Sequence, residues 1–227
     1  MNIGVLGTGP VGRTLSAHLA EGGHAVVIGT RDVAHTLAQT APDYMGNPAF
    51  SDWHSSHPQV RLGTFAEAAA HGEVLINVTA GSASLNALAA TGADALAGKV
   101  LLDVANPLDF SHGMPPSLLV CNTDSLAEQI QRAFPAVKVV KTLNIVSAPV
   151  MVNPSLVAGG DHHMLLCGND AGAREAVAGY LRDWFGWQHI LDLGDVTAAR
   201  GMEMILPVWL RLWGALQTPM FGYKIAR

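Results

Sequence analysis

Charged side chains are scarce in this chain, and no stretch of it is strongly basic. Lysine, arginine, aspartate and glutamate make up 14% of the 227 residues, and the formal net charge is −5. A nucleic-acid-binding surface needs clustered positive charge, so this composition argues against a nucleic-acid partner. Hydrophobic residues make up 49%, which is typical of a globular protein whose surface is partly covered by a second subunit. We therefore expect a homodimer.

Cysteine is also scarce. The only two, Cys121 and Cys167, each lie in an apolar, strand-like stretch, SLLVCN and HHMLLCGN. This placement predicts two buried free thiols and favours a reducing compartment, the cytoplasm. The first twenty residues lack the basic start and unbroken apolar run of a secretory signal, so we do not expect export.

The chain lacks the residue patterns of several common catalytic sites. No Ser/His/Asp arrangement with a nucleophile turn occurs, and the cysteines are not clustered. Two histidine pairs, His54 with His57 and His162 with His163, have no carboxylates at metal-ligand spacing, which favours ordinary loop and surface histidines over a metal site. We expect no catalytic side chain and no metal.

Two acidic residues flank the segment Asn106–Leu108. Asp103 lies at the end of an apolar run and Asp109 follows the segment, so they resemble a pair of acids. A carboxylate inside a buried strand needs hydrogen-bond partners, and we expect Asp103 to cap or bond to backbone groups.

The most informative stretch that is present is GTGPVG near the N-terminus. The apolar run Ile3–Leu6 predicts a strand, and Val11, Leu15 and Leu19 follow at helical spacing. The three glycines therefore lie on a strand-to-helix turn. In a dinucleotide-binding turn the first glycine allows the tight bend, the second lets a pyrophosphate approach, and the third lets helix and strand pack. The three are Gly7, Gly9 and Gly12.

The end of the second predicted strand bears on the choice of nucleotide. An NAD site normally has an acidic residue about twenty residues past the first glycine, where this chain has Thr30 and Arg31. A hydroxyl beside a guanidinium suits a phosphate, because arginine donates two parallel charged hydrogen bonds. The sequence thus favours NADP. Asp32 is the alternative, as an NAD-type acid in a shifted register with Arg31 in solvent.

Strand-like and helical segments alternate through the first two thirds of the chain, which predicts a Rossmann-type, doubly wound parallel α/β sheet. Ligands of such sheets lie beyond the carboxyl ends of the strands. Three segments follow apolar runs at such ends, and their small or amide side chains suit a flat, uncharged ring. They are Val78–Gly81 (with Val78, Thr79 and Ala80), Asn106–Pro107 (with Asn106), and Thr142–Asn144 (with Thr142).

The last eighty residues predict a small C-terminal α/β extension. We place a soft boundary near Ser147–Pro154, which gives a cofactor-binding domain over 1–148 and a substrate and dimerisation domain over 149–227. A helix capped by Asp170 is expected to end at Gly186. Apolar residues at helical spacing predict a final helix over Gly201–Tyr223, which polar residues interrupt too often for a membrane span. Its Trp and Met side chains are candidates for the pocket of an aromatic substrate.

Together, GTGPVG, IGTR, DVANPL and VVKTLN resemble the NADPH-dependent F420 reductases and, more distantly, the reductase domain of the membrane ferric reductases. The resemblance extends over the whole chain. It implies hydride exchange between NADPH and a deazaflavin, with the C-terminal portion closing over the acceptor.

The resemblance also implies roles for individual residues. It makes Thr8, Gly9, Pro10 and Val11 the phosphate turn, Thr30 and Arg31 the pair at the 2′-phosphate, and Thr142 a nicotinamide-side contact. Where the family suggests a lysine after the arginine, this chain has DVAHTL, and His35 is the nearest candidate.

Two readings remain open. In one, the protein is an NADPH-dependent reductase whose acceptor is F420, a flavin, ferric iron or another redox partner. In the other, it is a non-catalytic NADP sensor that reports redox state. Hydride exchange between two cofactors needs no catalytic acid, so the lack of one does not separate these readings.

Overall fold

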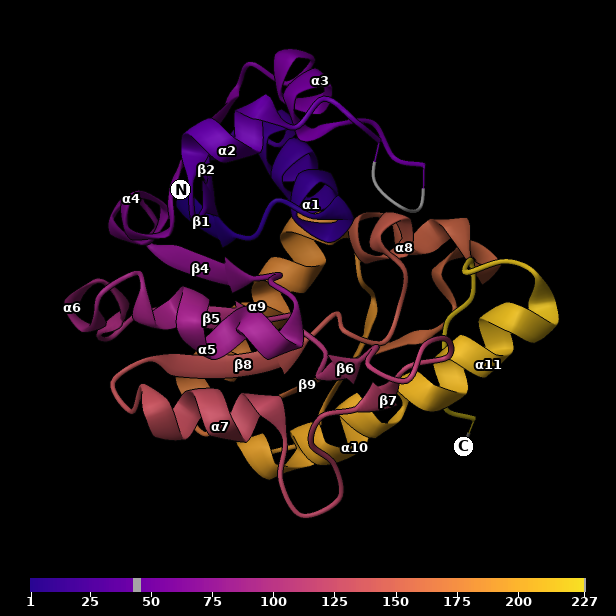
Figure 1. Ribbon diagram of the computed structural model, residues 1–227. Helices are drawn as coiled ribbons and strands as arrows, with labels where there is room; N and C mark the ends of the chain where they lie inside the picture. The colour runs from indigo at the N-terminus through magenta and orange to yellow at the C-terminus, as the bar shows by residue number, and fades with distance from the viewer. Residues whose placement is uncertain (43–45, 227) are drawn as a thin grey trace.

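The computed structural model describes residues 1–42 and 46–226. Within these residues the strands form one sheet of eight, ordered β10-β9-β8-β5-β4-β1-β2-β3, and a small separate hairpin, β6-β7 (Figure 1). All pairs in the main sheet are parallel except β8 with β9. The strands are β1 Asn2–Leu6, β2 Ala25–Thr30, β3 Val60–Thr64, β4 Val74–Asn77, β5 Val100–Asp103, β6 Leu108–Asp109, β7 Ser117–Leu118, β8 Lys138–Thr142, β9 His163–Cys167 and β10 His189–Asp192.

Helices connect the strands and cover both faces of the sheet, which confirms the predicted Rossmann-type α/β class. The α-helices are α1 Pro10–Glu21, α2 Val33–Ala38, α3 Phe50–Ser55, α4 Phe65–His71, α5 Gly81–Ala89, α6 Ala93–Leu96, α7 Leu126–Ala133, α8 Ala148–Val152, α9 Ala171–Phe185, α10 Ala199–Met204 and α11 Leu206–Leu216.

Apolar runs become central strands here because both of their faces are buried. In β4, Val74 and Ile76 pack into the core on the side of α1, α8 and α9. The intervening Leu75 packs on the other side, with residues of α4 to α7 and α10. Successive side chains of a strand point to opposite faces, so an unbroken apolar run fills two cores at once.

The C-terminal portion is an α/β extension whose strands β9 and β10 lengthen the main sheet. The proposed boundary at 148/149 falls at the start of α8. One prediction for this portion differs from the structure. The expected helix over Gly201–Tyr223 is two helices, α10 and α11, and the second ends at Leu216. Gln217 takes a left-handed conformation at its C-cap (φ 56°), which directs the chain out of the helix.

Three helix termini carry the residues that typically cap a helix. Asp170 caps α9 by accepting a hydrogen bond from the backbone N–H of Ala173, and Gly186 ends the helix in the left-handed conformation. Ser125 caps α7 through the N–H of Glu128. These caps satisfy backbone donors and carbonyls that the helix itself leaves unpaired.

The two thiols lie in different environments. Cys167 is buried in β9, as expected, and burial raises its pKa to about 12. The prediction for Cys121 is wrong, because this residue is exposed. It follows the short hairpin strand β7, which lies outside the main sheet, so its apolar neighbours in sequence do not bury it.

Candidate functional site

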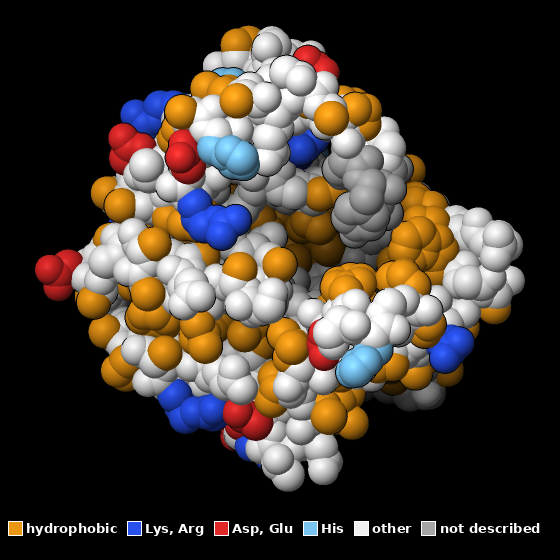
Figure 2. Space-filling view, in the orientation of Figure 1, with side chains coloured by type: hydrophobic (Ala, Val, Ile, Leu, Met, Phe, Trp, Pro, Cys, Tyr) orange, Lys and Arg blue, Asp and Glu red, His pale blue; other side chains and the backbone are white. Residues whose placement is uncertain are grey.

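The strand order has a switch point between β1 and β4. From β1 the chain proceeds outward through β2 and β3, whereas β4, β5 and β8 proceed the other way. The connections diverge there, which leaves a crevice at the carboxyl ends of the two strands. The molecular face in Figure 2 is hollowed near its centre, and hydrophobic side chains line the hollow; in the same orientation of Figure 1, β4 points toward it.

The three glycines of the first turn have distinct environments in the structure. Gly7 has a positive φ of 122°, and a Cβ on Gly12 would lie 2.0 Å from the carbonyl oxygen of Gly7. Neither position accepts a side chain without strain. A Cβ on Gly9, in contrast, would meet nothing within 4 Å. The turn is therefore tightly packed at its first and third glycines and open at its second, which fits a ligand approaching the backbone there.

Helix α1 begins at this turn without a side-chain cap. Gly9 is the N-cap residue, no side chain accepts from the first N–H groups, and the first turn contains no acidic residue. Unpaired N–H groups and the helix dipole favour an anion at this position. Thr8 and Val11 are half-buried and Pro10 is exposed beside it. The residues present thus fit the pyrophosphate of a dinucleotide.

At the end of β2, Arg31 is exposed and Thr30 is buried. Thr36 Oγ1 donates to the carbonyl of Asp32, so Thr30 Oγ1, 2.8 Å away, must donate to Thr36 Oγ1. Thr30 has one hydroxyl proton, and it is already used inside the protein. Of the two residues predicted to bind the 2′-phosphate, only Arg31 therefore has hydrogen-bond donors left for a ligand.

The structure assigns Asp32 a different task from the NAD-type acid. Its carboxylate caps α2 by accepting from the backbone N–H of His35 at 2.9 Å. The side chain of His35 is exposed on α2, where its Nε2 lies 3.3 Å from Gln39 Nε2. A capping carboxylate is less available to a ribose hydroxyl, so this arrangement favours the reading with Arg31 as the nucleotide-selective residue.

The segment after β4 contributes Val78 and Thr79, both half-buried, and the exposed Ala80. Gly81 then starts α5 so close to the segment after β5 that a Cβ on it would lie 2.2 Å from the carbonyl oxygen of Asn106. Two of the three predicted ring-lining segments are therefore adjacent.

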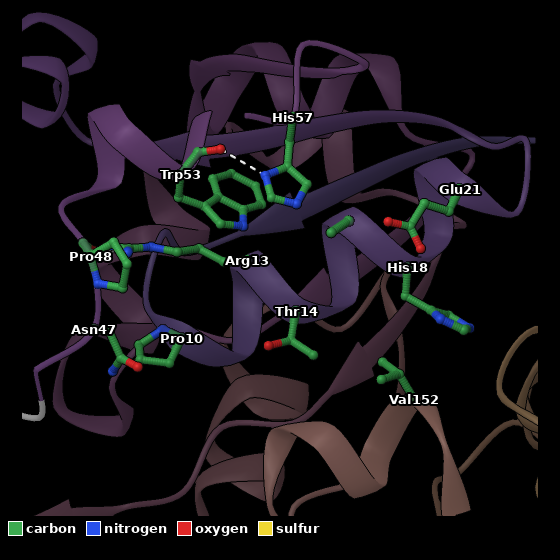
Figure 3. Close-up of a pocket in the computed structure, with 11 residues that line it drawn as sticks. Pro10, Arg13, Thr14, His18, Glu21, Asn47, Pro48, Trp53, His57 and Val152 are labelled. Carbon is green, nitrogen blue, oxygen red and sulfur yellow. Dashed lines mark hydrogen bonds between the residues drawn. The ribbon is translucent and has the colours of Figure 1, made fainter. Parts of the chain in front are cut away.

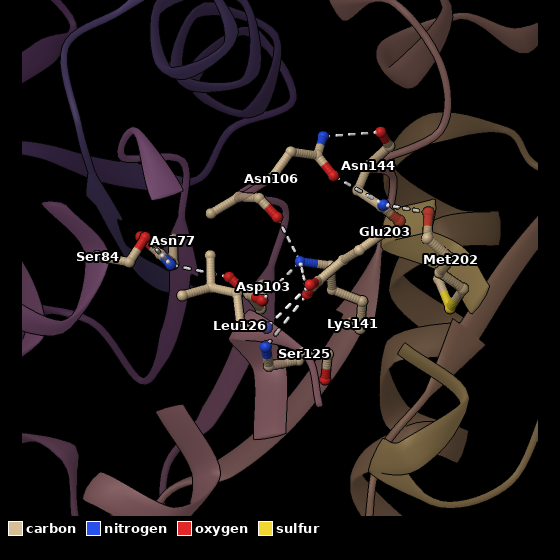
Figure 4. Close-up of polar contacts among 12 residues, drawn as sticks. Asn77, Ser84, Asp103, Asn106, Ser125, Leu126, Lys141, Asn144, Met202 and Glu203 are labelled. Atoms are coloured by element: carbon tan, nitrogen blue, oxygen red, sulfur yellow. Dashed lines mark hydrogen bonds and ion pairs between the residues drawn. The ribbon is translucent and has the colours of Figure 1, made fainter. Parts of the chain in front are cut away.

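The third segment is linked to Asn106 by a pair of amides. Asn106 Nδ2 donates to the carbonyl of Asn144, and Asn144 Nδ2 donates to Asn106 Oδ1 and to the carbonyl of Met202 (Figure 4). Thr142 is placed differently: its side chain is fully buried and its hydroxyl donates to the carbonyl of Leu165 at 2.9 Å. The Thr142 hydroxyl thus joins β8 to β9, and its contact with the nicotinamide stays a prediction.

A buried ion network lies beneath these segments. Lys141 Nζ is 2.9 Å from Asp103 Oδ2 and 2.9 Å from Glu203 Oε1, and it also donates to the carbonyl of Ala105 (Figure 4). The Lys141 and Asp103 side chains are 0% exposed and that of Glu203 is 1% exposed. Although burial opposes the lysine's charge, the two carboxylates outweigh this penalty and raise the pKa of Lys141.

This network corrects one prediction and reveals two residues that the sequence did not single out. Asp103 bonds to Lys141 and to Asn77 Nδ2 rather than to backbone groups, and it forms no pair with Asp109, which accepts from the N–H of Ser111. Lys141 and Glu203 were missed. The signal was present, because each is a lone charge within an apolar run, and such charges need a partner when buried.

A separate pocket of about 390 Å³ borders the first turn (Figure 3). It lies along α1, with Trp53 and His57 on one side and Val152 of α8 on the other. Arg13, which lines it, donates to the carbonyls of Thr8 and Pro48 and thereby links the phosphate turn to the segment after residue 45.

The histidine pairs are more buried than expected. His54 and His57 are part-buried, and each has a ring nitrogen within hydrogen-bond distance of a backbone carbonyl, that of Val60 or Trp53. The prediction of a surface residue is wrong for His162, which is 2% exposed and packs edge-on against Trp187. Among the described residues, no group of three or more His, Cys, Asp or Glu is arranged to hold a metal ion.

The parallel sheet, with its glycine turn between β1 and α1, defines a Rossmann-type α/β protein. The family model described as NADP oxidoreductase, coenzyme F420-dependent, matches residues 2–107. A solved structure from Arthrobacter sp. FB24, named as a candidate F420-dependent NADP-reductase, is 57% identical, with a TM-score of 0.96 and complete coverage of both chains. The chain therefore belongs to the family of F420-dependent NADP oxidoreductases.

Two further relatives are more distant. The metalloreductase STEAP3 of Rattus norvegicus is 30% identical over 214 residues, which cover 91% of this chain but 37% of that protein, so this chain spans little more than a third of its relative's length. A reductive aminase from Aspergillus terreus, solved with NADPH and ethyl levulinate, is 16% identical with a TM-score of 0.61, covering 95% of this chain and 62% of that one. This last likeness shows the fold alone.

No helix within residues 1–42 and 46–226 is both long enough and apolar enough to cross a bilayer.

Proposed function

We propose that this protein binds NADP(H) across the carboxyl ends of β1 and β4 and exchanges hydride between NADPH and a planar acceptor, the deazaflavin F420. The observation that carries the proposal is the first turn, which is closed at Gly7 and Gly12, open at Gly9 and followed by an uncapped helix. Family membership supports the nucleotide and, through the family's name, the acceptor.

The residues have simple tasks in this proposal. The first-turn N–H groups of α1 bind the pyrophosphate, and Arg31 binds the 2′-phosphate with charged hydrogen bonds. The segments around Thr79 and Asn106 orient the nicotinamide end and exclude water from one side of it. The bound nucleotide supplies the hydride chemistry, so the protein contributes orientation and proximity rather than an acid or base.

The partition of the chain follows from the same proposal. We assign nucleotide binding to residues 1–148 and propose that residues 149–227 supply the acceptor side and the contact with a second subunit. The free thiols Cys121 and Cys167 and the dependence on NADPH support a cytoplasmic location.

The test is turnover with defined acceptors. Purified protein is mixed with NADPH and F420, FMN or a ferric chelate, and the loss of NADPH absorbance in the near ultraviolet is followed. Sustained oxidation with F420 supports the proposal, and oxidation with only FMN or iron identifies a flavin or ferric reductase instead. Tight NADPH binding without turnover with any acceptor would contradict it and favour the redox sensor.

A further inference from the structure

Thr79 is the one hydroxyl in the segment after β4, and its hydrogen bonds limit what it can offer a ligand. Thr79 Oγ1 lies 2.7 Å from Asn77 Oδ1 and 2.8 Å from Ser84 Oγ. The Thr79 backbone N–H also donates to Asn77 Oδ1, at 3.3 Å. A hydroxyl has one proton and two acceptor lone pairs. The contact that takes the proton therefore decides whether Thr79 can donate to a ligand or only accept from it.

The orientation of the Asn77 amide is determined from both sides. Its Nδ2 donates to Asp103 Oδ1 at 2.8 Å and to Ser84 Oγ at 3.2 Å. If the amide were reversed, its oxygen would face the Asp103 carboxylate and its NH₂ would face the N–H of Thr79. Both contacts would be repulsive, so Asn77 Oδ1 faces Thr79. Because an amide oxygen only accepts, the Thr79 hydroxyl must donate its proton to Asn77.

Lys141 keeps the other end of this chain of bonds in place. Asp103 accepts from Asn77 through one carboxylate oxygen and from Lys141 through the other. Lys141 uses its three protons on Asp103, Glu203 and the carbonyl of Ala105. Every donor and acceptor from Lys141 to Asn77 has a defined partner, and a fully satisfied buried network keeps one orientation.

We propose that the buried relay Lys141–Asp103–Asn77 fixes Thr79 as a hydrogen-bond acceptor for a donor group of the bound dinucleotide, a nicotinamide carboxamide N–H or a ribose hydroxyl. This inference rests on the proposed function and deepens it. With the Thr79 proton on Asn77, the 2.8 Å contact requires Ser84 to donate to Thr79. The Ser84 hydroxyl also has the carbonyl of Ala80 within reach, but at 3.4 Å that contact is the longer one. Thr79 is left with one lone pair. Thr79 is half-buried and reachable, whereas Asn77, Asp103 and Lys141 are buried positioning residues.

The first arm of the test compares two variants of Thr79 in binding measurements. Thr79→Val keeps the shape and removes the acceptor, while Thr79→Ser keeps the hydroxyl. Dissociation constants are measured for NADP⁺ and for its acetylpyridine analogue, in which a methyl group replaces the carboxamide NH₂. We expect Thr79→Val to weaken NADP⁺ binding about tenfold, the scale of one hydrogen bond, and Thr79→Ser to restore it.

The second arm tests the relay. In Asp103→Asn, the amide oxygen must face Lys141, so the amide NH₂ faces Asn77 and forces that amide to reverse. Thr79 then loses its acceptor and presents a proton instead. Asn77→Ala removes the same acceptor but keeps the Asp103–Lys141 pair, so it tests the relay if Asp103→Asn fails to fold. Asp103→Asn should reproduce the Thr79→Val binding profile. Asn77→Ala should weaken NADP⁺ binding in the same direction but less, because the Thr79 hydroxyl loses its fixed orientation and keeps its lone pairs. Thr91→Val, which removes a buried hydroxyl bonded to the carbonyl of Leu88, is the control and should bind like wild type.

The outcomes are distinct. Loss of affinity for NADP⁺ but not for the analogue identifies the carboxamide as the donor, and equal loss for both identifies a ribose hydroxyl. Wild-type affinity of Thr79→Val for both nucleotides would overturn the inference, as would wild-type binding by folded Asn77→Ala. These measurements need no acceptor, so wild-type protein that does not bind NADP⁺ at all contradicts the proposed function separately.

Discussion

In the proposed function, Arg31 is the residue on which the choice between NADP and NAD depends. Thr30 and Asp32, its neighbours in sequence, are both occupied within the protein, one by Thr36 and the other by the start of α2. We therefore expect the exposed Arg31 guanidinium to be the local group that distinguishes a 2′-phosphate from a hydroxyl.

We predict that Arg31→Ala weakens NADPH binding by about 1.5–3 kcal/mol, the scale of a hydrogen bond to a charged group, and leaves NADH binding nearly unchanged. Titration calorimetry with both nucleotides measures this. Arg182→Ala, at an exposed arginine on α9, is the matched control and should change neither. Equal losses for the two nucleotides in Arg31→Ala would remove the 2′-phosphate assignment.

The glycines of the first turn allow a paired prediction. Gly9→Ala places its Cβ in open space, so the variant should keep the wild-type melting temperature while NADPH affinity falls about tenfold, ~1.4 kcal/mol. Gly12→Ala places its Cβ 2.0 Å from a backbone oxygen and should lower the melting temperature itself. Thermal unfolding with and without NADPH separates the effects. A Gly9→Ala protein that binds like wild type would show that no phosphate approaches this backbone.

At the scale of elements, α7 and α10 are joined by polar contacts. Arg200 on α10 donates to both carboxylate oxygens of Glu128 on α7, at 2.6 and 2.9 Å. Glu203 accepts from the N–H groups of Leu126 and Ala127 at the start of α7. Because α11 follows α10 directly, these bonds also determine where the apolar C-terminal helix lies.

This contact predicts a dependence of stability on pH. The Arg200 guanidinium lowers the pKa of Glu128 below its usual value, so the pair stabilises the fold above the unfolded-state pKa of Glu. That contribution, about 1 kcal/mol, is lost as the pH falls through the folded-state pKa.

Thermal melts between neutral pH and pH ~4 would measure the effect. Glu128→Gln should lower the melting temperature at neutral pH and flatten its decline towards acid, relative to wild type. Glu175→Gln, on the exposed side of α9, should leave the wild-type profile unchanged. Parallel profiles for wild type and Glu128→Gln would contradict the prediction.

Features of the helices and strands that depend on residues close together in the sequence could be predicted, and features that depend on distant residues could not. The turn after β1 and the two ends of α9 depend on residues a few positions apart, and their sequence signals were sufficient. The end of α11 at Leu216 and the exposure of Cys121 depend on distant partners. The tail beyond α11 pairs Tyr223 with His163 instead of continuing the helix.

At the scale of the whole molecule, α11 stands out as an apolar helix that stays largely exposed within the part of the chain that the structure describes. Its sequence, LPVWLRLWGAL, is almost entirely hydrophobic, yet Leu206 is its one buried residue. Val208 is 54% exposed and Leu216 is 53% exposed. A large exposed apolar patch of this kind marks a site of contact with a partner.

We predict a homodimer that buries α11. Light scattering after size-exclusion chromatography should give twice the monomer mass for wild type, and Val208→Glu with Leu216→Glu should give the monomer with an unchanged far-ultraviolet circular dichroism spectrum. A control pair on α9, Glu175→Ala with Arg182→Ala, should remain dimeric. Monomeric wild-type protein at the concentrations used for turnover would rule out this use of α11.

Short-range patterns in the sequence were enough to predict the class of fold, the glycine turn after β1 and the place of Arg31 at the end of β2. These depend on the period of apolar residues and on glycines at fixed spacing, which are properties of short segments. The tertiary structure alone decided that β9 and β10 extend the main sheet, that Thr142 is buried, and that Lys141, Asp103 and Glu203 form one network. Those three residues are far apart in the chain, and nothing local indicates which charges will meet. Their pairing follows from the need to compensate each charge that the folded sheet removes from water.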